Sequence, residues 1–299
     1  MNRKSAVTGV GGYTGKYITQ RILDRGDSVI NLTGHPNKQT IFGDSVKSYP
    51  FSFNEPDKLM DTFKEVDVLF NTYWIRYPQN NITFEVAIEN SFKLITAAKD
   101  AGVKKLVHIS ITNPSIDSKY GYFRGKAIIE DFIIKSGLNF SILRPAVIFG
   151  NEGILFNNIA WFMRHLPVFG IPGNGRYHLN PIFVEDIADL AVSESLNQEN
   201  RIIDAVGPDN FTMNKLVDVI KKAVGSKCLI IPTPKLIAYF VTSLLGIYLK
   251  DKILTLDELG SLEDDLLSSN SDAAGKTSFK DWIKDKADVI GKNYMRDAR

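Results

Sequence analysis

The chain has 299 residues, of which 44% are hydrophobic and 23% are charged, an ordinary globular composition. Its 36 basic and 34 acidic residues give a net charge of +2 and are dispersed, so nucleic acid is excluded as an expected partner. The length supports one large domain, or a large one with a smaller one. The single cysteine, Cys228, excludes an intramolecular disulfide and lies in an apolar run that predicts a buried, inert thiol.

Apolar runs of strand length alternate with helical stretches through the first half of the chain. The pattern predicts strands at residues 4–8, 28–33, 46–51, 67–71, 105–110 and 139–144, and helices at 14–25, 56–64, 82–101 and 122–136. Strands that alternate with helices of this length indicate βαβ units and a parallel sheet.

After Gly150 the alternation breaks. Residues 151–176 are rich in glycine, proline and aromatics, whereas 182–196 and 202–206 again resemble a helix and a strand of the main sheet. From Gly207 the chain is mostly helical. We predict an α/β fold in which a doubly wound parallel sheet is built from residues 1–150 and completed by about 177–206. The smaller, mostly helical substrate-binding domain would comprise residues 151–176 and 207–299.

The most apolar stretch, residues 236–249, is shorter than the roughly 20 residues that span a membrane, so no transmembrane segment is predicted. We interpret it as a core helix, with a membrane-surface or oligomer-contact helix as the alternative. No secretory signal is visible before the first strand, and a cytoplasmic location is the default expectation. The sequence leaves open whether the protein forms a homodimer.

A glycine-rich turn follows the first predicted strand and opens the first helix. Gly9 would allow the tight turn, Gly12 would let the backbone approach a pyrophosphate, and Gly15 would let the helix pack closely on the strand. The first helical amides, including those of Tyr13 and Thr14, would point at the phosphates and be aided by the helix dipole. This context predicts a site for NAD or NADP; the alternative is a glycine turn with no ligand.

The end of the second strand distinguishes the two nucleotides. NAD sites place an Asp or Glu there to bind the ribose hydroxyls, and residues 32–38 contain no carboxylate. His35 and Lys38 would suit a 2′-phosphate, which favours NADP over NAD. The alternative is that both side chains belong to a solvated loop.

Tyr122 and Lys126 are four residues apart and therefore share one face of a predicted helix. A neighbouring ammonium lowers the pKa of a tyrosine towards the range in which it transfers protons. The lysine would also reach the cofactor ribose. Ser110 or Thr112, after the preceding strand, would bind the substrate oxygen.

The same spacing occurs at Tyr248 and Lys252, so spacing alone decides nothing. Position separates the two pairs, because Tyr122 follows a strand whose carboxyl end lies at the ligand-binding edge of such sheets. Tyr248 lies in an apolar helix, where we expect packing. The alternative for Tyr122 and Lys126 is a plain amphipathic helix face.

These motifs together resemble the extended or atypical branch of the short-chain dehydrogenase/reductase superfamily, over nearly the whole chain. The resemblance includes NAD-dependent epimerase-like proteins, NmrA-like proteins and the nucleotide-binding accessory subunit of complex I. It rests on the TGxxGxxG turn, a strand ending in Asn71, a strand ending in Ser110, YxxxK followed by Glu130, and the stretches 141–150 and 183–188. The similarity to the epimerase-like proteins and the complex I subunit rests especially on residues 254–258 and 281–283 of the tail.

The resemblance implies a Rossmann fold that binds NAD(P), with Tyr122 as general acid/base, Lys126 as its activator and Ser110 orienting the substrate. The backbone after Pro145 would meet the nicotinamide. Asn113 and Pro114 stand where sugar-nucleotide dehydratases carry an acidic pair, which argues against dehydration.

Other departures affect the rim of the site. Ser52 stands where an aspartate often contacts adenine, and Phe183 replaces a common histidine. The loop 72–77 is unusually aromatic. It would either shape an apolar, ring-stacking substrate site or cap the cofactor and pack beneath a neighbouring loop.

The first functional hypothesis is an NAD(P)-dependent oxidoreductase or epimerase acting on a small-molecule substrate, a nucleotide sugar included. The second is a non-catalytic NAD(P) sensor or assembly protein. No metal is expected, because none of the four histidines has metal-ligand spacing. His108, in an apolar strand, is predicted to be a satisfied interior residue.

Overall fold

The structure, a computed structural model, describes residues 2–79 and 81–296. The chain forms two compact units. Unit 1 contains the chain up to Pro145 together with Val184–Asp204, and unit 2 contains Ala146–Phe183 and the chain from Ala205. The sequence placed the corresponding boundaries at residues 150, 177 and 206.

Unit 1 is built on a seven-stranded sheet with the order β11-β6-β5-β4-β1-β2-β3. The pairs from β6 to β3 are parallel. The order reverses between β1 and β4, which is the switch point where such sheets bind ligands. The predicted doubly wound fold is confirmed. The strands are β1 (Lys4–Thr8), β2 (Ser28–Thr33), β3 (Val46–Pro50), β4 (Val68–Asn71), β5 (Lys105–Ile109), β6 (Phe140–Pro145) and β11 (Arg201–Ala205).

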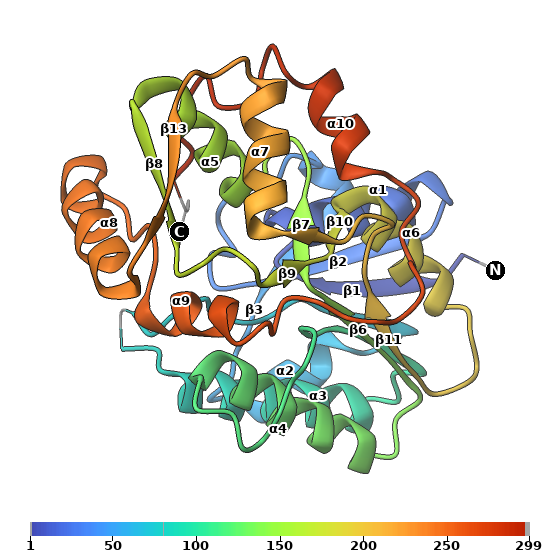
Figure 1. Cartoon of the computed structure of the whole chain (residues 1–299). Helices are drawn as coiled ribbons and strands as arrows, with labels where there is room; N and C mark the ends of the chain where they lie inside the picture. The colour runs from blue at the N-terminus through green and yellow to red at the C-terminus, as the bar shows by residue number, and fades with distance from the viewer. Residues whose placement is uncertain (1, 80, 297–299) are drawn as a thin grey trace. The chain divides into compact units, whose positions relative to one another are not determined.

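Helices cover both faces of this sheet. On one face α1 (Tyr13–Asp24) packs against α6 (Val184–Glu194), and on the other α3 (Phe84–Asp100) packs between α2 (Pro56–Thr62) and α4 (Gly121–Lys135) (Figure 1). A short 3-10 helix, Gly43–Ser45, precedes β3.

The helix α3 shows why the chain folds this way locally. Thr83 caps its first turn by accepting from the Val86 amide, and the chain leaves it through Gly102, whose φ is +84°. Ala87, Leu94 and Ala98 recur at helical spacing and are fully buried against the sheet side of the unit.

Unit 2 is mostly helical, with three two-stranded ribbons, β10-β7, β12-β9 and β13-β8. Its elements are β7 (Val147–Phe149), α5 (Ile154–His165), β8 (Val168–Pro172), β9 (His178–Leu179), β10 (Pro181–Phe183), β12 (Phe211–Thr212), α7 (Met213–Ala223), β13 (Leu229–Thr233), α8 (Lys235–Leu249), α9 (Leu256–Glu263) and α10 (Phe279–Asp285). The predicted excursion at 151–176 is the segment that supplies α5 and β8.

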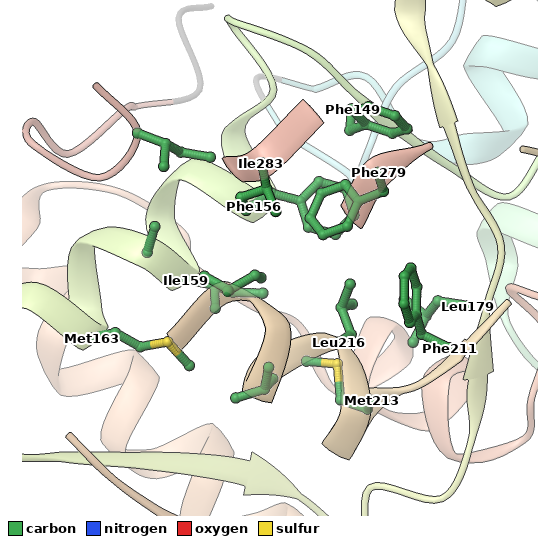
Figure 2. Packing of buried hydrophobic residues seen from close by; sticks show 14 of the residues in the cluster. Phe149, Phe156, Ile159, Met163, Leu179, Phe211, Met213, Leu216, Phe279 and Ile283 are labelled. Carbon is green, nitrogen blue, oxygen red and sulfur yellow. The ribbon is translucent and has the colours of Figure 1, made fainter. Parts of the chain in front are cut away.

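An aromatic core holds unit 2 together. Figure 2 shows Phe156 of α5, Phe149 of β7 and Phe279 of α10 converging on one cluster. The Phe279 ring centroid lies 4.6 Å from that of Phe156 and 5.1 Å from that of Phe149, and all three side chains are fully buried. The aromatic contacts therefore tie the C-terminal helix to segments more than a hundred positions earlier.

The helix α8 differs from its prediction. Only Ala238, Gly246 and Leu249 of this helix are buried, while most of its large apolar side chains are exposed. The interpretation as a core helix is therefore wrong, and so is the packing role expected for Tyr248, which is 81% exposed. The prediction for Cys228 is confirmed, since its thiol is buried and burial raises its pKa.

Replacing Phe279 tests the role of the aromatic core. We expect Phe279→Ala to lower the free energy of unfolding by about 3–5 kcal/mol, because it removes a buried ring and leaves a cavity. Urea denaturation, monitored by near-UV circular dichroism, measures the free energy of unfolding. The exposed Val289→Ala should change stability by less than about 0.5 kcal/mol. Equal stability of the two variants would show that the cluster does not support unit 2.

Candidate functional site

The glycine turn between β1 and α1 is closed by a backbone hydrogen bond. Gly9 has a φ of +71°, and its carbonyl accepts from the Gly12 amide at 2.8 Å. A β-carbon at Gly15 would lie 2.3 Å from the Gly9 carbonyl oxygen, and one at Gly12 would lie 3.0 Å from it. The conformation of Gly9 and the close packing at Gly12 and Gly15 therefore require glycine for steric reasons, while the role predicted for Gly12 at a pyrophosphate stays a prediction.

This turn fits a pyrophosphate. The N-cap of α1 is Gly12, which has no side chain to cap the first amides, including those of Thr14 and Gly15. The first turn of α1 contains no acidic residue. The amides and the positive end of the helix dipole thus remain available for an anion.

Two contacts that sequence reasoning missed fix the turn in place. Asn31 of β2, buried in the sheet, accepts from the Val10 amide at 3.0 Å. Thr72, just after β4, donates its hydroxyl to the Thr8 carbonyl at 2.5 Å, while its amide donates to the Thr8 hydroxyl at 2.7 Å. A polar residue in mid-strand and a threonine after a strand were the only sequence signals for them.

The two candidates for a 2′-phosphate lie after β2. His35 and Lys38 are both exposed and are joined by a turn in which the Lys38 amide donates to the His35 carbonyl at 3.0 Å. The turn brings both side chains to the loop that follows β2.

Lys126, on α4, is buried beside the end of β5. It is 2% exposed, and its Nζ donates to the Ile109 carbonyl at 2.6 Å. Burial lowers the pKa of Lys126 to about 7, against an opposing effect of Glu130. Tyr122, one turn earlier on the same helix, is half-buried. The two side chains that the sequence paired are thus on one face of α4, as predicted.

Ser110 follows β5 and is tied to a buried ion pair. Its hydroxyl donates to the Glu130 carboxylate at 2.5 Å, and that carboxylate also accepts from both Nε and one terminal nitrogen of Arg144. Since a hydroxyl has a single proton, Ser110 in this arrangement can only accept from a substrate or from another side chain. Thr112, the alternative to Ser110, is fully buried, and its amide donates to the Pro145 carbonyl.

The aromatic loop covers this region from one side. The Trp74 ring lies edge-on to Tyr122 at 5.8 Å between centroids and stacks on Phe84 of α3 at 5.7 Å. The ammonium of Lys126 lies 5.2 Å from the Trp74 ring centroid. A β-carbon at Gly125 would lie 2.4 Å from the indole, so a glycine there permits the contact.

Tyr73, which precedes Trp74 in the loop 72–77, packs against a neighbouring loop. Tyr73 packs against Phe51 and Phe53, with centroids at 5.1 and 5.4 Å, and its hydroxyl accepts from Asn90. Ser52, between the two phenylalanines, has a φ of +43°. This half of the loop packs beneath a neighbouring loop.

Asn71, at the end of β4, is fully buried beside His108. Its amide nitrogen lies 3.1 Å from His108 Nδ1, and its oxygen accepts from the Tyr73 amide. His108 is interior as predicted but only half satisfied, because its Nε2 has no hydrogen-bond partner among the described residues. Burial lowers the pKa of His108 well below its ordinary value, and the imidazole is neutral.

The chain is similar in sequence to proteins that bind NAD(P)H and to subunits of NADH-ubiquinone oxidoreductase. The model of a family described as NAD(P)H-binding matches residues 9–156. The chain is 25% identical over 299 residues to the mitochondrial NADH-ubiquinone oxidoreductase 40 kDa subunit of Neurospora crassa, covering 97% of this chain and 77% of that protein. These matches support the resemblance of the chain to the extended, NmrA-like branch of the short-chain dehydrogenase/reductase superfamily.

A second relative in sequence is longer than this chain, and a solved structure has the same fold. The mitochondrial NADH dehydrogenase (ubiquinone) 1 alpha subcomplex subunit 9 of Arabidopsis thaliana is 24% identical over 227 residues, which cover 72% of this chain and 56% of that protein. The chain therefore spans little more than half of that relative. Citrobacter triphenylmethane reductase complexed with NADP(H) superposes with a TM-score of 0.75 and 19% identity over 95% of this chain and 99% of that chain, which shows a shared fold.

The described residues show neither the grouping of ligands that a metal centre would need nor the apolar helix that a membrane span would need. In the part of the chain that the structure describes, no three histidine, cysteine, aspartate or glutamate side chains are grouped as metal ligands would be. The same described residues include no helix with the length and apolarity needed to cross a membrane.

The glycine turn can be tested by nucleotide binding. We expect Gly12→Val to weaken NADPH binding by about 100-fold or more, because its side chain would occupy the approach to the pyrophosphate. Fluorescence titration measures the affinity. Gly11→Ala is the matched control, since a β-carbon there meets nothing within 4 Å. Undiminished binding by Gly12→Val would remove the turn from the nucleotide site.

The burial of Lys126 predicts how stability changes with pH. The unfolded lysine keeps its proton up to a pKa near 10.5, whereas the folded one loses it above about 7. Between these values the unfolded state binds more protons, so the free energy of unfolding rises with pH. Urea denaturation at about pH 6 and about pH 9 should show a steeper rise for the wild type than for Lys126→Met. Identical pH dependence would contradict the buried position of the ammonium.

Proposed function

We propose that the protein is an NAD(P)-dependent oxidoreductase or epimerase-like enzyme that exchanges a hydride with an oxygen-bearing carbon of a small molecule. The observation that carries the proposal is the joint position of Tyr122 and Lys126 on α4, beside the carboxyl end of β5. In the same unit lies a glycine turn suited to a pyrophosphate. A bound nicotinamide would supply or accept the hydride.

Tyr122 is the proton donor and acceptor in this proposal. In the reducing direction its hydroxyl gives a proton to the substrate oxygen as the carbon gains the hydride, and the resulting phenolate regains a proton from solvent. The Lys126 ammonium stabilises the phenolate, and its pKa of about 7 lets it change charge near neutral pH. Pro145, at the end of β6, precedes the backbone proposed to meet the nicotinamide.

Ser110 has a positioning role. Its proton is committed to Glu130, whose carboxylate is fixed by Arg144, so its oxygen accepts a hydrogen bond rather than donating one. The hydroxyl of an alcohol, which is the substrate of the oxidising direction and the product of the reducing direction, would provide such a donor. Asn71 contributes indirectly, by fixing the Tyr73 amide and His108 at the end of β4.

NADP is the proposed cofactor, with NAD as the alternative. No carboxylate follows β2, and His35 and Lys38 are exposed on the loop where a 2′-phosphate would lie. Both side chains are free to turn towards an anion without leaving a core position.

A second candidate function is a non-catalytic NAD(P)-binding accessory or assembly protein. One structural observation favours it: the Trp74 indole covers Lys126 and fills the space above Gly125, where a nucleotide ribose would approach the lysine. Relatives named as subunits of NADH-ubiquinone oxidoreductase add support. In this case the nucleotide would bind through the glycine turn and remain unreacted.

The proposed acid is tested by Tyr122→Phe. A panel of aldehydes, ketones and quinones is screened for NADPH or NADH oxidation. We expect Tyr122→Phe to lower turnover of the best substrate by about 100-fold or more while nucleotide affinity stays within about twofold, because the phenol acts only in proton transfer. Lys126→Ala should weaken both.

The two candidates give different outcomes. Full turnover by Tyr122→Phe would overturn the assignment of the acid. Tight nucleotide binding without turnover across the panel, in the wild type and in Trp74→Ala alike, would favour the accessory role.

A further inference from the structure

The helix α8 is apolar on its inner side and also on its exposed side. The side that it turns to the rest of unit 2 includes Ala238, Gly246 and Leu249, which are buried. Its outward side is a stripe of large apolar side chains that are 46% to 81% exposed: Leu236, Ile237, Phe240, Val241, Leu244, Ile247 and Tyr248. An exposed apolar surface of this extent on a globular protein marks an interaction site.

The apolar surface continues beyond the helix. The ribbon β8-β13 contacts α8 and lies beside it at the edge of unit 2 (Figure 1). Val168 and Leu229 face each other across this ribbon, and both are exposed, as is Ile231 two residues further along β13. No polar side chain interrupts this set along the register.

Charge at the C-terminal end of α8 favours one partner. The helix contains no acidic residue; Lys235, at its start, is paired with Glu263 at 3.6 Å, whereas Lys250 and Lys252 follow its end on either side of Asp251. A parallel helix pair from two copies of the chain would bring the Lys250 and Lys252 ends together, which is unfavourable. An anionic surface with an apolar interior complements both the stripe and its flanks.

A hollow next to the stripe adds a place for a headgroup. It has a volume of about 430 Å³ and lies between α8 and the following segment, lined by Ser243, Lys250 and Lys252 among others. The one carboxylate in its wall, Asp251, accepts from the Tyr294 hydroxyl at 2.7 Å. The hollow therefore has a positive balance of charge and lies beside apolar side chains.

We propose that α8 binds the surface of an anionic lipid bilayer, with its apolar stripe among the acyl chains and Lys250 and Lys252 at the headgroup phosphates. A helix of 15 residues is about 22 Å long, less than the roughly 30 Å of bilayer hydrocarbon, so α8 lies in the plane of the interface. Phe240 and Tyr248 supply the aromatic rings that suit this boundary. The proposal is independent of the catalytic one.

Vesicle flotation of the full chain tests this. The protein is mixed with vesicles of equal parts phosphatidylglycerol and phosphatidylcholine, or of phosphatidylcholine alone. We expect binding to the anionic vesicles that weakens at high salt, and about tenfold or greater loss of binding in the double variant Phe240→Gln, Ile247→Gln. Lys250→Gln should lose part of the binding to anionic vesicles only. The matched control, Ile41→Gln with Ile116→Gln, removes equally exposed apolar side chains from unit 1 and should bind like the wild type.

Three outcomes would overturn the proposal. One is that the wild type binds neither vesicle. Another is that the α8 double variant, shown by circular dichroism to be folded, binds as tightly as the control. The third is concentration-dependent dimerisation without lipid that the α8 variant abolishes, measured by light scattering, which would make a second copy the partner.

Discussion

The close approach of α1 to β1 is the constraint on which the nucleotide site depends. The Gly9 carbonyl lies where a β-carbon at Gly15 would be, so the helix can begin only where glycines remove side chains from both segments. That approach aims the uncapped amides of α1 at the switch point of the sheet. Asn31 of β2 and Thr72, which follows β4, then hold the turn from the two sides of β1, so the sheet itself preorganises the proposed anion site.

The proposed catalytic side chains depend on a second constraint, a buried network of charges. Glu130 binds both Arg144 and the Ser110 hydroxyl, and it opposes the effect of burial on Lys126. Glu130 and Arg144 are paired with each other, and the Lys126 ammonium donates to the Ile109 carbonyl. The hydrogen bond to Glu130 leaves the Ser110 oxygen as an acceptor, so in the proposed reaction Tyr122 is the group that gives up a proton.

Unit 2 has a core and a surface with opposite characters. Its aromatic core around Phe279 is buried and contains most of the apolar residues of α5, α7 and α10. Most of the large apolar side chains of α8 lie outside that core, because the helix turns only Ala238, Gly246 and Leu249 inward. The exposed stripe is therefore a surface feature separate from the core, and it is the basis of the lipid binding that we propose.

The sequence by itself determined the sheet, the glycine turn and the pairing of Tyr122 with Lys126, because these follow from local periodicity and fixed spacing along one chain segment. It could not determine which way α8 faces, since an apolar helix has the same pattern whether its partner is a core or a lipid surface. The contact of Trp74 with Gly125 and the use of the Ser110 proton by Glu130 were equally hidden. They join residues far apart in sequence, and only the tertiary structure brings such atoms within bonding distance.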